Sequence, residues 1–364
     1  MKVRDFIPLA EPWIDKEEAE EVYKVVESGW LRQGELVKKF EKEFAKTVGT
    51  KYAVAVSSGT AALHVAFAAL DLGGSEVIMP SFTCIPPFSM AILAGATPVL
   101  VDIELETYNI CPEAVRKAIS SKTKAIVPIN YAGHPAELAE LVEIANENGI
   151  FLVNDAAEAL GATYNNKKIG KFGDIAVFSF SPNKTITTGE GGMIATNNEE
   201  LAEMARVIRD YGQKQRFHYI ELGSNYHMTE MQAAIGLVQL KKLDKIIGKK
   251  RKNARLLTEY LGDSRVITPV EKSNCTHVYM LYTVRVEESN RDLVMSTLEK
   301  KGIQCRVYFP PVHWSPIVKK YPCVIKETVN TDTAGSQVFS LPSSPFLSEE
   351  EIEYIANALK SVIT

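Results

Sequence analysis

The sequence is 364 residues long, which allows more than one folding core at the usual size of about 100–200 residues per domain. The formal net charge of −4 excludes neither enzyme nor binding protein, but it makes nucleic acid and anionic membranes unexpected partners. No apolar run approaches the roughly 18 residues of a spanning helix, and no signal-peptide core follows the first residues. The five cysteines are scattered without a CxxC pair, which predicts reduced thiols in a cytoplasmic protein and no metal site.

The first 196 residues predict an α/β fold. Residues 15–44 have helical spacing, interrupted by glycines around Trp30. Short apolar runs then alternate with helical stretches, a pattern typical of a mostly parallel sheet with helices on both faces. The last run follows a Gly-rich turn without a crossover helix, so an antiparallel strand is expected there. The expected strands are Tyr52–Val56, Glu76–Met79, Pro98–Asp102, Lys124–Ile129, Phe151–Asn154, Ile175–Phe180 and Met193–Thr196.

A second, smaller domain is predicted near the carboxyl terminus. A long helix begins near Thr229, and its basic stretch at 241–255 alternates with apolar residues, which favours a solvated helix face over a nucleic-acid site. After it come expected strands at 276–286 and 304–308 and expected helices at 291–301 and 349–363. We therefore predict a large domain over residues 1–255 and a small α+β domain over residues 256–364.

The stretch at 178–192, FSFSPNKTITTGEGG, is the strongest candidate for chemistry. It begins as a strand, breaks at Pro182, which cannot donate to a sheet ladder, and presents Lys184 before a Gly-rich turn. A lysine so placed lies at the floor of a cleft and can form a Schiff base with a carbonyl. An isolated lysine is more often a solvated surface residue, so the interpretation depends on its surroundings.

Two upstream segments supply those surroundings. Asp155 ends an expected buried strand, and ligands of open α/β sheets lie just outside the carboxyl ends of the strands. Gly59 and Thr60 stand between a strand and a helix, where free amides and the helix dipole bind anions. An anion cradle, an acid and a lysine in this order suit pyridoxal phosphate, whose ring nitrogen needs an acidic or basic partner.

These motifs resemble the DegT/DnrJ/EryC1/StrS family of pyridoxal-phosphate-dependent aminotransferases of nucleotide-sugar and related biosynthesis. The similarity runs nearly end to end. The matching segments include SGWLRQG at 28–34, SSGTAALH at 57–64, PSFT at 80–83, NDAAEALGA at 154–162, NKTITTGEGG at 183–192, GSNYHMTEMQAAIGLVQL at 223–240 and FPPVH at 309–313. The resemblance implies the fold-type I architecture, a seven-stranded, mostly parallel sheet with helices on both faces plus a smaller C-terminal α+β domain.

The resemblance also assigns roles to individual residues. It implies that Ser179 binds the cofactor phosphate, that Glu158 lies near the phenolic oxygen, and that Asn225 reaches the phosphate of a partner subunit in a homodimer. Cys84 departs from the family, because an aromatic residue that stacks on the ring is usual at that place. Trp30 and His313 fall in segments that the family has near the cofactor and at the substrate end of the cleft.

The predicted function is transfer of an amino group from glutamate to a keto sugar nucleotide. The wording after Lys184 is closest to the branch that aminates a 4-keto carbon, as in GDP-perosamine synthases, so a 4-keto-6-deoxy sugar is expected. Three alternatives stay open. They are an aminotransferase acting on a non-nucleotide ketone such as a cyclitol, a sugar dehydratase, which Lys184 argues against, and a non-catalytic regulatory protein on the same fold.

Overall fold

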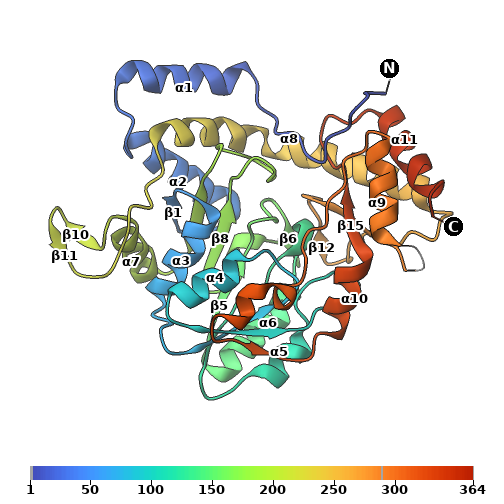
Figure 1. Ribbon diagram of the computed structural model, residues 1–364. Coiled ribbons are helices and arrows are strands. Elements are labelled where there is room, and N and C mark those ends of the chain that lie inside the picture. The colour runs from blue at the N-terminus through green and yellow to red at the C-terminus, as the bar shows by residue number, and fades with distance from the viewer. Residues whose placement is uncertain (1–2, 288–289, 364) are drawn as a thin grey trace.

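The computed structural model describes residues 3–287 and 290–363. Its larger part is built on an eight-stranded sheet of order β1-β9-β8-β5-β4-β2-β3-β14 (Figure 1). All neighbours are parallel except those that include β9, which confirms the antiparallel strand predicted after the Gly-rich turn. The strands are β1 (Tyr52–Val56), β2 (Glu76–Pro80), β3 (Thr97–Val101), β4 (Thr123–Ile126), β5 (Phe151–Asp155), β8 (Ile175–Ser179), β9 (Gly192–Thr196) and β14 (Val324–Ile325).

Helices cover both faces of this sheet, as the alternation of elements predicts. Successive side chains of β1 show why, because Ala53 and Ala55 join one apolar core while Val54 and Val56 join the other. Both faces of each central strand are therefore apolar, as expected in a parallel sheet. One face is covered by α2 (Glu35–Val48), α5 (Pro112–Ala118), α6 (Leu138–Asn148) and α8 (Glu230–Leu261), and the other by α3 (Gly59–Ala69), α4 (Pro86–Leu93) and α7 (Glu199–Arg209).

The 32-residue helix α8 runs along both parts of the molecule (Figure 1). Thr229 caps it, with the side chain of Gln232 returning to the backbone of Thr229. Glu230, the next residue, instead accepts the first backbone N–H groups of α2, from Gly34, Leu36 and Val37 at 2.9 Å each. This buried carboxylate therefore ties the amino ends of two helices together. The amino-terminal helix α1 (Lys16–Ser28) lies along α8.

The C-terminal part has its own apolar core around the end of α8. Its elements are β13 (Tyr282–Arg285), α9 (Arg291–Lys300), β15 (Val338–Leu341) and α11 (Glu349–Lys360), with β13 and β15 paired antiparallel. Ser348 and Glu351 form a capping box on α11, as their spacing suggests. The strand expected at 276–286 is divided into β12 (Cys275–Thr276) and β13, because Met280 and Leu281 between them turn into a separate core. The strand expected at 304–308 is wrong, since Ile303 and Arg306 make only isolated bridges.

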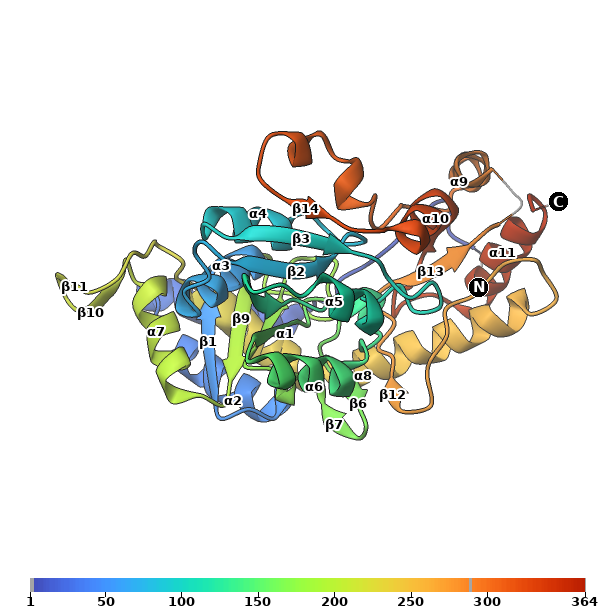
Figure 2. The ribbon, with the colours of Figure 1, turned by 90° about the horizontal axis from the view of Figure 1, so that it is seen from below.

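The chain returns to the large sheet after this excursion. Residues 312–325 of the expected small domain pack on the large sheet, where β14 lies beside β3 with Val324 opposite Val99 (Figure 2). The carboxylate of Asp102, just after β3, accepts the backbone N–H groups of Asn330 and Thr331 at the start of α10 (Val329–Gln337). A two-residue edge strand has no periodicity, so nothing in the sequence indicates an eighth strand.

Short elements complete the chain. They are β6 (Thr163–Tyr164), β7 (Lys167–Lys168), β10 (Gln213–Gln215), β11 (His218–Tyr219), and the 3-10 turns η1 (Tyr131–Gly133), η2 (Ile169–Lys171), η3 (Val312–Trp314) and η4 (Pro316–Lys319). A search of the described helices finds none that combines the length and the apolar character needed to cross a membrane.

Candidate active site

A cleft of about 390 Å³ opens at the carboxyl edge of the large sheet. Parallel strands end together at this edge, so residues far apart in sequence meet there. The site residues predicted from the sequence that line this cleft are Gly59, Thr60, Cys84, Asp155, Glu158, Ser179 and Lys184.

Lys184 lies in the turn after β8 with its amine at the floor of the cleft. Its Nζ is 3.2 Å from Oε1 of Glu158, and the two side chains are only 13% and 6% exposed. Glu158 is held in place because its other oxygen accepts the backbone N–H of Ala132 at 2.8 Å. The pair therefore forms a buried, preoriented amine–carboxylate contact that still faces the cleft.

Asp155 ends β5 and is almost fully buried beside this pair. Its Oδ1 accepts the backbone N–H of Ala157 at 3.0 Å. Burial raises the pKa of the Asp155 carboxyl to about 6, against the opposing effects of that hydrogen bond and of the Lys184 charge. A cation placed against this carboxyl would stabilise its ionised form, and a protonated pyridine nitrogen is such a cation.

The amino end of α3 forms the other end of the cleft. Ser58 caps the helix by accepting the N–H of Ala61 at 3.0 Å, and the remaining first-turn amides have no acceptor within the helix. Close packing needs glycine here. A Cβ on Gly59 would lie 2.6 Å from Cβ of Ser179, and one on Gly192 would lie 2.2 Å from the carbonyl oxygen of Ser58. Free amides beside the Ser179 hydroxyl suit a phosphate group.

Cys84 lines the cleft together with two aromatic residues. Burial raises the pKa of the Cys84 thiol, so this cysteine is a neutral, apolar surface of the cleft. Tyr308 and Phe309 also line the cleft, and the sequence analysis did not single them out. The signal that pointed to them was the resemblance of residues 308–313 to the 4-aminating branch of the family.

Three predicted residues lie outside this cleft. Trp30 is 65% exposed. Asn225 is exposed, and its Oδ1 lies 2.8 Å from Nδ1 of His227, whose Nε2 is 2.9 Å from Asp210. His313 has both ring nitrogens engaged by protein side chains.

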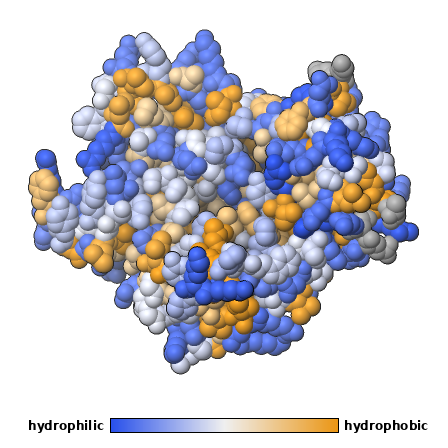
Figure 3. All heavy atoms as spheres, in the orientation of Figure 1, coloured by the Kyte–Doolittle hydropathy of each residue, from blue (hydrophilic) through white to orange (hydrophobic). Residues whose placement is uncertain are grey.

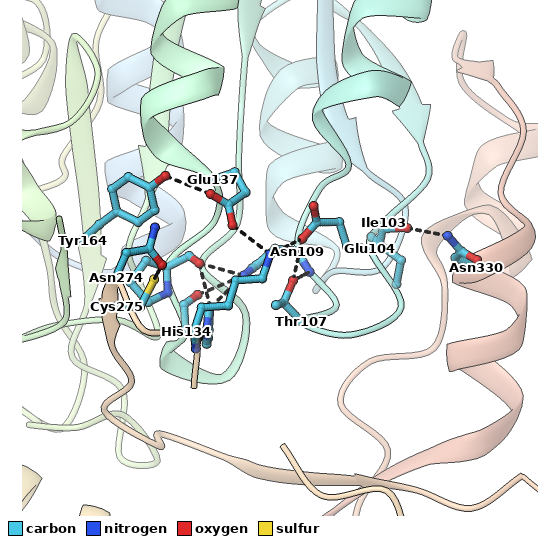
Figure 4. Close-up of polar contacts among 12 residues, drawn as sticks. Ile103, Glu104, Thr107, Asn109, His134, Glu137, Tyr164, Asn274, Cys275 and Asn330 are labelled. Atoms are coloured by element: carbon cyan, nitrogen blue, oxygen red, sulfur yellow. Dashed lines mark hydrogen bonds and ion pairs between the residues drawn. The ribbon is translucent and has the colours of Figure 1, made fainter. Parts of the chain in front are cut away.

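A second lysine–carboxylate cluster, the junction cluster, is formed by Glu104, Asn109, His134, Glu137 and Lys272. Figure 4 labels its members other than the lysine. The Lys272 amine lies 2.8 Å from Glu137 and 3.2 Å from Glu104. Asn109 donates to the backbone carbonyl of His134, and His134 Nε2 accepts the backbone N–H of Lys272. The cluster joins the large sheet to the chain that leads into the C-terminal part, and its members partner one another.

The cleft groups match the chemical needs of one cofactor. A desolvated lysine, a carboxylate at a strand end and a phosphate-binding helix terminus define a pyridoxal-phosphate-dependent transferase of fold-type I. The chain belongs to the DegT/DnrJ/EryC1/StrS aminotransferase family, whose sequence profile matches residues 12–360. Pyridoxal phosphate is therefore the cofactor that these residues would hold.

Individual relatives agree with this assignment. The chain is 37% identical over 367 residues to a GDP-perosamine synthase of Caulobacter vibrioides, covering 98% of each protein. Among solved structures, the sugar aminotransferase Spr1654 of Streptococcus pneumoniae in its pyridoxal phosphate form has a TM-score of 0.94 at 28% identity, with 98% of each chain covered. DesI, solved in the presence of its TDP-sugar product, has a TM-score of 0.92 at 30% identity, covering 98% of this chain and 93% of that one.

Proposed function

We propose that this protein transfers the amino group of glutamate to the ketone of a 4-keto-6-deoxy sugar nucleotide. The observation that carries the proposal is the buried contact between Lys184 and Glu158, in the cleft that also contains Asp155 and the amino end of α3. The relatives named above support the substrate class, since one is a GDP-perosamine synthase and another was solved with a TDP-sugar product. The 4-keto preference rests on the wording of residues 183–192.

The residues of the cleft divide the work. Bound pyridoxal phosphate supplies an aldehyde carbon for amine exchange and a ring that accepts electrons. The amine of Lys184 holds the cofactor and, once free, moves a proton to and from the substrate carbon. Glu158 orients that amine through the 3.2 Å contact. Asp155 keeps the proton on the ring nitrogen, since an ionised carboxylate there stabilises a cation.

The opposite end of the cleft binds rather than reacts. The first-turn amides of α3, at Gly59 and Thr60, and the Ser179 hydroxyl hold the phosphate. Fixing the phosphate fixes the distance between the reactive carbon and Lys184, and errors of about 1 Å in such a distance cost on the order of 100-fold in rate.

A homodimer completes the site in this proposal. Asn225 lies outside the cleft of its own chain, so it is free to reach the phosphate of a neighbouring chain. Exposed apolar side chains on the same flank support an interface, and Figure 3 shows hydrophobic groups over α1 and at the β10–β11 hairpin. They are Tyr23, Val26, Trp30, Leu31, Tyr211, Phe217, Tyr219, Ile220 and Leu222.

The substrate is tested by offering 3-keto and 4-keto sugar nucleotides side by side with glutamate and assigning the aminated carbon by NMR. We expect a 4-amino product. A 3-amino product overturns the regiochemistry alone, whereas failure of glutamate to change the absorbance of the bound cofactor overturns the proposed donor.

The dimer is tested with mixed chains. A hybrid of Lys184→Ala and Asn225→Ala chains contains one cleft in which both residues are intact, if Asn225 serves the partner. We expect activity to return when the two variants are re-associated. Hybrids proven by mass that stay inactive would contradict the assignment of Asn225.

A further inference from the structure

The segment from Tyr308 to Asp332 connects the cleft to the outer edge of the sheet. Tyr308 and Phe309 line the cleft at its start. Four residues later, His313 lies in η3, and Asp332 lies in the first turn of α10. The stretch between them contains β14, the edge strand of the sheet. The position of the cleft wall therefore depends on how this returning segment is anchored.

His313 is the centre of one anchor. Its Nδ1 lies 2.7 Å from the hydroxyl of Ser81, and its Nε2 lies 2.9 Å from Oδ1 of Asp332. The His313 side chain is 12% exposed and Ser81 is completely buried. Neither ring nitrogen is left for a substrate, which distinguishes His313 from a residue that contacts the reacting groups.

The hydrogen-bond roles in this chain of contacts follow from chemistry. A carboxylate only accepts, so His313 carries a proton on Nε2 and donates it to Asp332. In the neutral ring the lone pair on Nδ1 then accepts from the Ser81 hydroxyl, whose oxygen also accepts the backbone N–H of His313 at 3.3 Å. The backbone carbonyl of Ser81 accepts the N–H of Val312 at 2.7 Å. Ser81 is thus bound to the returning segment through both its side chain and its backbone.

Ser81 directly follows β2 and precedes Thr83 and Cys84, which also line the cleft. The Asp332–His313–Ser81 relay therefore joins two chain segments that line the same cleft. A further contact anchors Tyr308 itself, because the buried hydroxyl of Tyr131 donates to the backbone carbonyl of Tyr308.

We propose that the Asp332–His313–Ser81 relay is a positioning device that fixes Tyr308 and Phe309 relative to the Thr83–Cys84 segment of the cleft, and so determines how well the amino acceptor binds. This inference rests on the proposed function. A sugar nucleotide is larger than glutamate and contacts more of the cleft lining. Loosening these segments therefore weakens binding of the acceptor more than binding of the donor. The Lys184 amine and the carboxylates of Glu158 and Asp155 do not contact the relay, so their geometry is kept when the relay is changed.

The relay can be cut one contact at a time. His313→Asn keeps a polar group at the Nδ1 position, near Ser81, and removes the contact with Asp332. His313→Gln keeps a donor at the Nε2 position, near Asp332, and removes the contact with Ser81. Asp332→Asn preserves an acceptor oxygen for Nε2 and should rescue what Asp332→Ala loses. Trp314→Phe is the matched control, because the Trp314 indole donates to the same Asp332 oxygen at 2.7 Å without joining the relay.

Each variant is measured for acceptor KM, for the absorbance change that glutamate causes in the cofactor-loaded protein, for cofactor affinity and for the thermal midpoint. We expect both His313 variants and Asp332→Ala to raise acceptor KM about 3- to 10-fold, the equivalent of one hydrogen bond. Asp332→Asn and Trp314→Phe should stay near the wild type, and the glutamate response and cofactor affinity should be unchanged in all of them.

The outcomes separate the inference from the proposed function. A lower thermal midpoint with unchanged acceptor KM would show that the relay is only structural. Equal losses in the glutamate response and in acceptor KM would place His313 in the catalytic machinery and overturn the positioning role. If the wild-type protein itself does not respond to glutamate, the proposed function fails first. Direct titration of a sugar nucleotide into the cofactor-loaded variants then still tests the relay, because equal affinity in His313→Gln and the wild type would overturn the positioning role.

Discussion

Two clusters in this molecule pair a lysine with carboxylates, and they differ in whether every charged group has a close partner of opposite charge. In the junction cluster, burial lowers the pKa of Lys272, but Glu137 and Glu104 outweigh it and raise that pKa. In the cleft, Lys184 has one contacting carboxylate, Glu158. Burial raises the pKa of Asp155 beside them, because the Lys184 charge and one backbone hydrogen bond do not offset its desolvation. The charges of the junction cluster are paired without a ligand, whereas the cleft retains a buried carboxyl that a bound cation would stabilise.

The difference shows how a functional lysine is distinguished from a structural one. Both lysine side chains are largely buried, and both contact carboxylates. A satisfied network contributes rigidity, whereas a buried titratable group with incomplete partners beside a cavity is a candidate for chemistry. The predictions below separate the two clusters by changing one at a time.

Lys184→Ala should produce the largest change. Turnover should fall at least about 10³-fold, since the residue acts both in holding the cofactor and in proton transfer. The thermal midpoint should stay near that of the wild-type protein because the side chain faces a cleft. Turnover and the visible absorbance of added cofactor are the measurements. Near-normal turnover in this variant would contradict the proposed role of Lys184.

Asp155→Asn should reduce turnover on the order of 100-fold while the cofactor still binds. A neutral amide cannot stabilise a proton on the ring nitrogen, so the ring accepts electrons poorly. The comparison is kcat at equal cofactor saturation. Full activity in the amide variant would mean that Asp155 plays no electronic part.

Gly59→Ala should weaken cofactor binding by about 1–3 kcal/mol, because the new methyl overlaps Ser179 beside the phosphate end. Gly248→Ala is the matched control, since a Cβ at that position in α8 meets no atom within 4 Å. It should leave cofactor affinity unchanged and stabilise the helix by about 0.8–1 kcal/mol. Equal cofactor affinity in the two variants would argue against a phosphate at the α3 terminus.

Lys272→Ala should give the opposite pattern from Lys184→Ala. Removing the cation leaves Glu104 and Glu137 facing each other in a partly buried site, which should lower the free energy of unfolding by about 1–3 kcal/mol. Turnover at a temperature where the variant is folded should stay close to that of the wild-type protein. Denaturant titration and kcat measure the two effects, and a loss of kcat without a loss of stability would give the junction cluster a catalytic role.

Acidification should lower the free energy of unfolding, in part through histidines near the junction cluster. Burial lowers the pKa of His134 and lowers that of His277 well below the usual value, so the unfolded chain takes up protons first. Stability should therefore fall as the pH drops below about 6.5, by up to about 1.4 kcal/mol per pH unit for each histidine. Asp155, with its raised pKa, opposes this in the cofactor-free chain. One carboxyl is outweighed because burial also lowers the pKa of His64 and His227, which makes four histidines in all.

His277→Leu isolates the acid effect, because leucine does not titrate. The slope of the unfolding free energy against pH should decrease by up to about 1.4 kcal/mol per pH unit below pH 6.5, whatever the variant costs at neutral pH. An unchanged slope would mean that His277 is protonated in the folded protein.

The sequence predicts the large sheet and much of the site because those features are local. Each strand of the large sheet from β1 to β9 contains a short apolar run. Asp155 ends β5, and Gly59 and Lys184 lie in the turns that follow β1 and β8. The same reasoning misses contacts made across long separations. Neither the role of Glu230 in capping α2 nor the relay from His313 to Ser81 leaves any local pattern. Tyr308 and Phe309 reach the cleft only because the chain returns to the sheet.

That return has a consequence for synthesis. Strand β14 is only two residues long, yet it completes an edge formed by a strand more than 200 residues earlier in the chain. While the ribosome is still adding residues, β3 therefore remains an unpaired edge, and such edges are prone to pair with other chains. The Asp102 carboxylate that caps α10 likewise has to wait for its partners. We infer that nascent chains stopped before residue 324 are the form of this protein most exposed to aggregation.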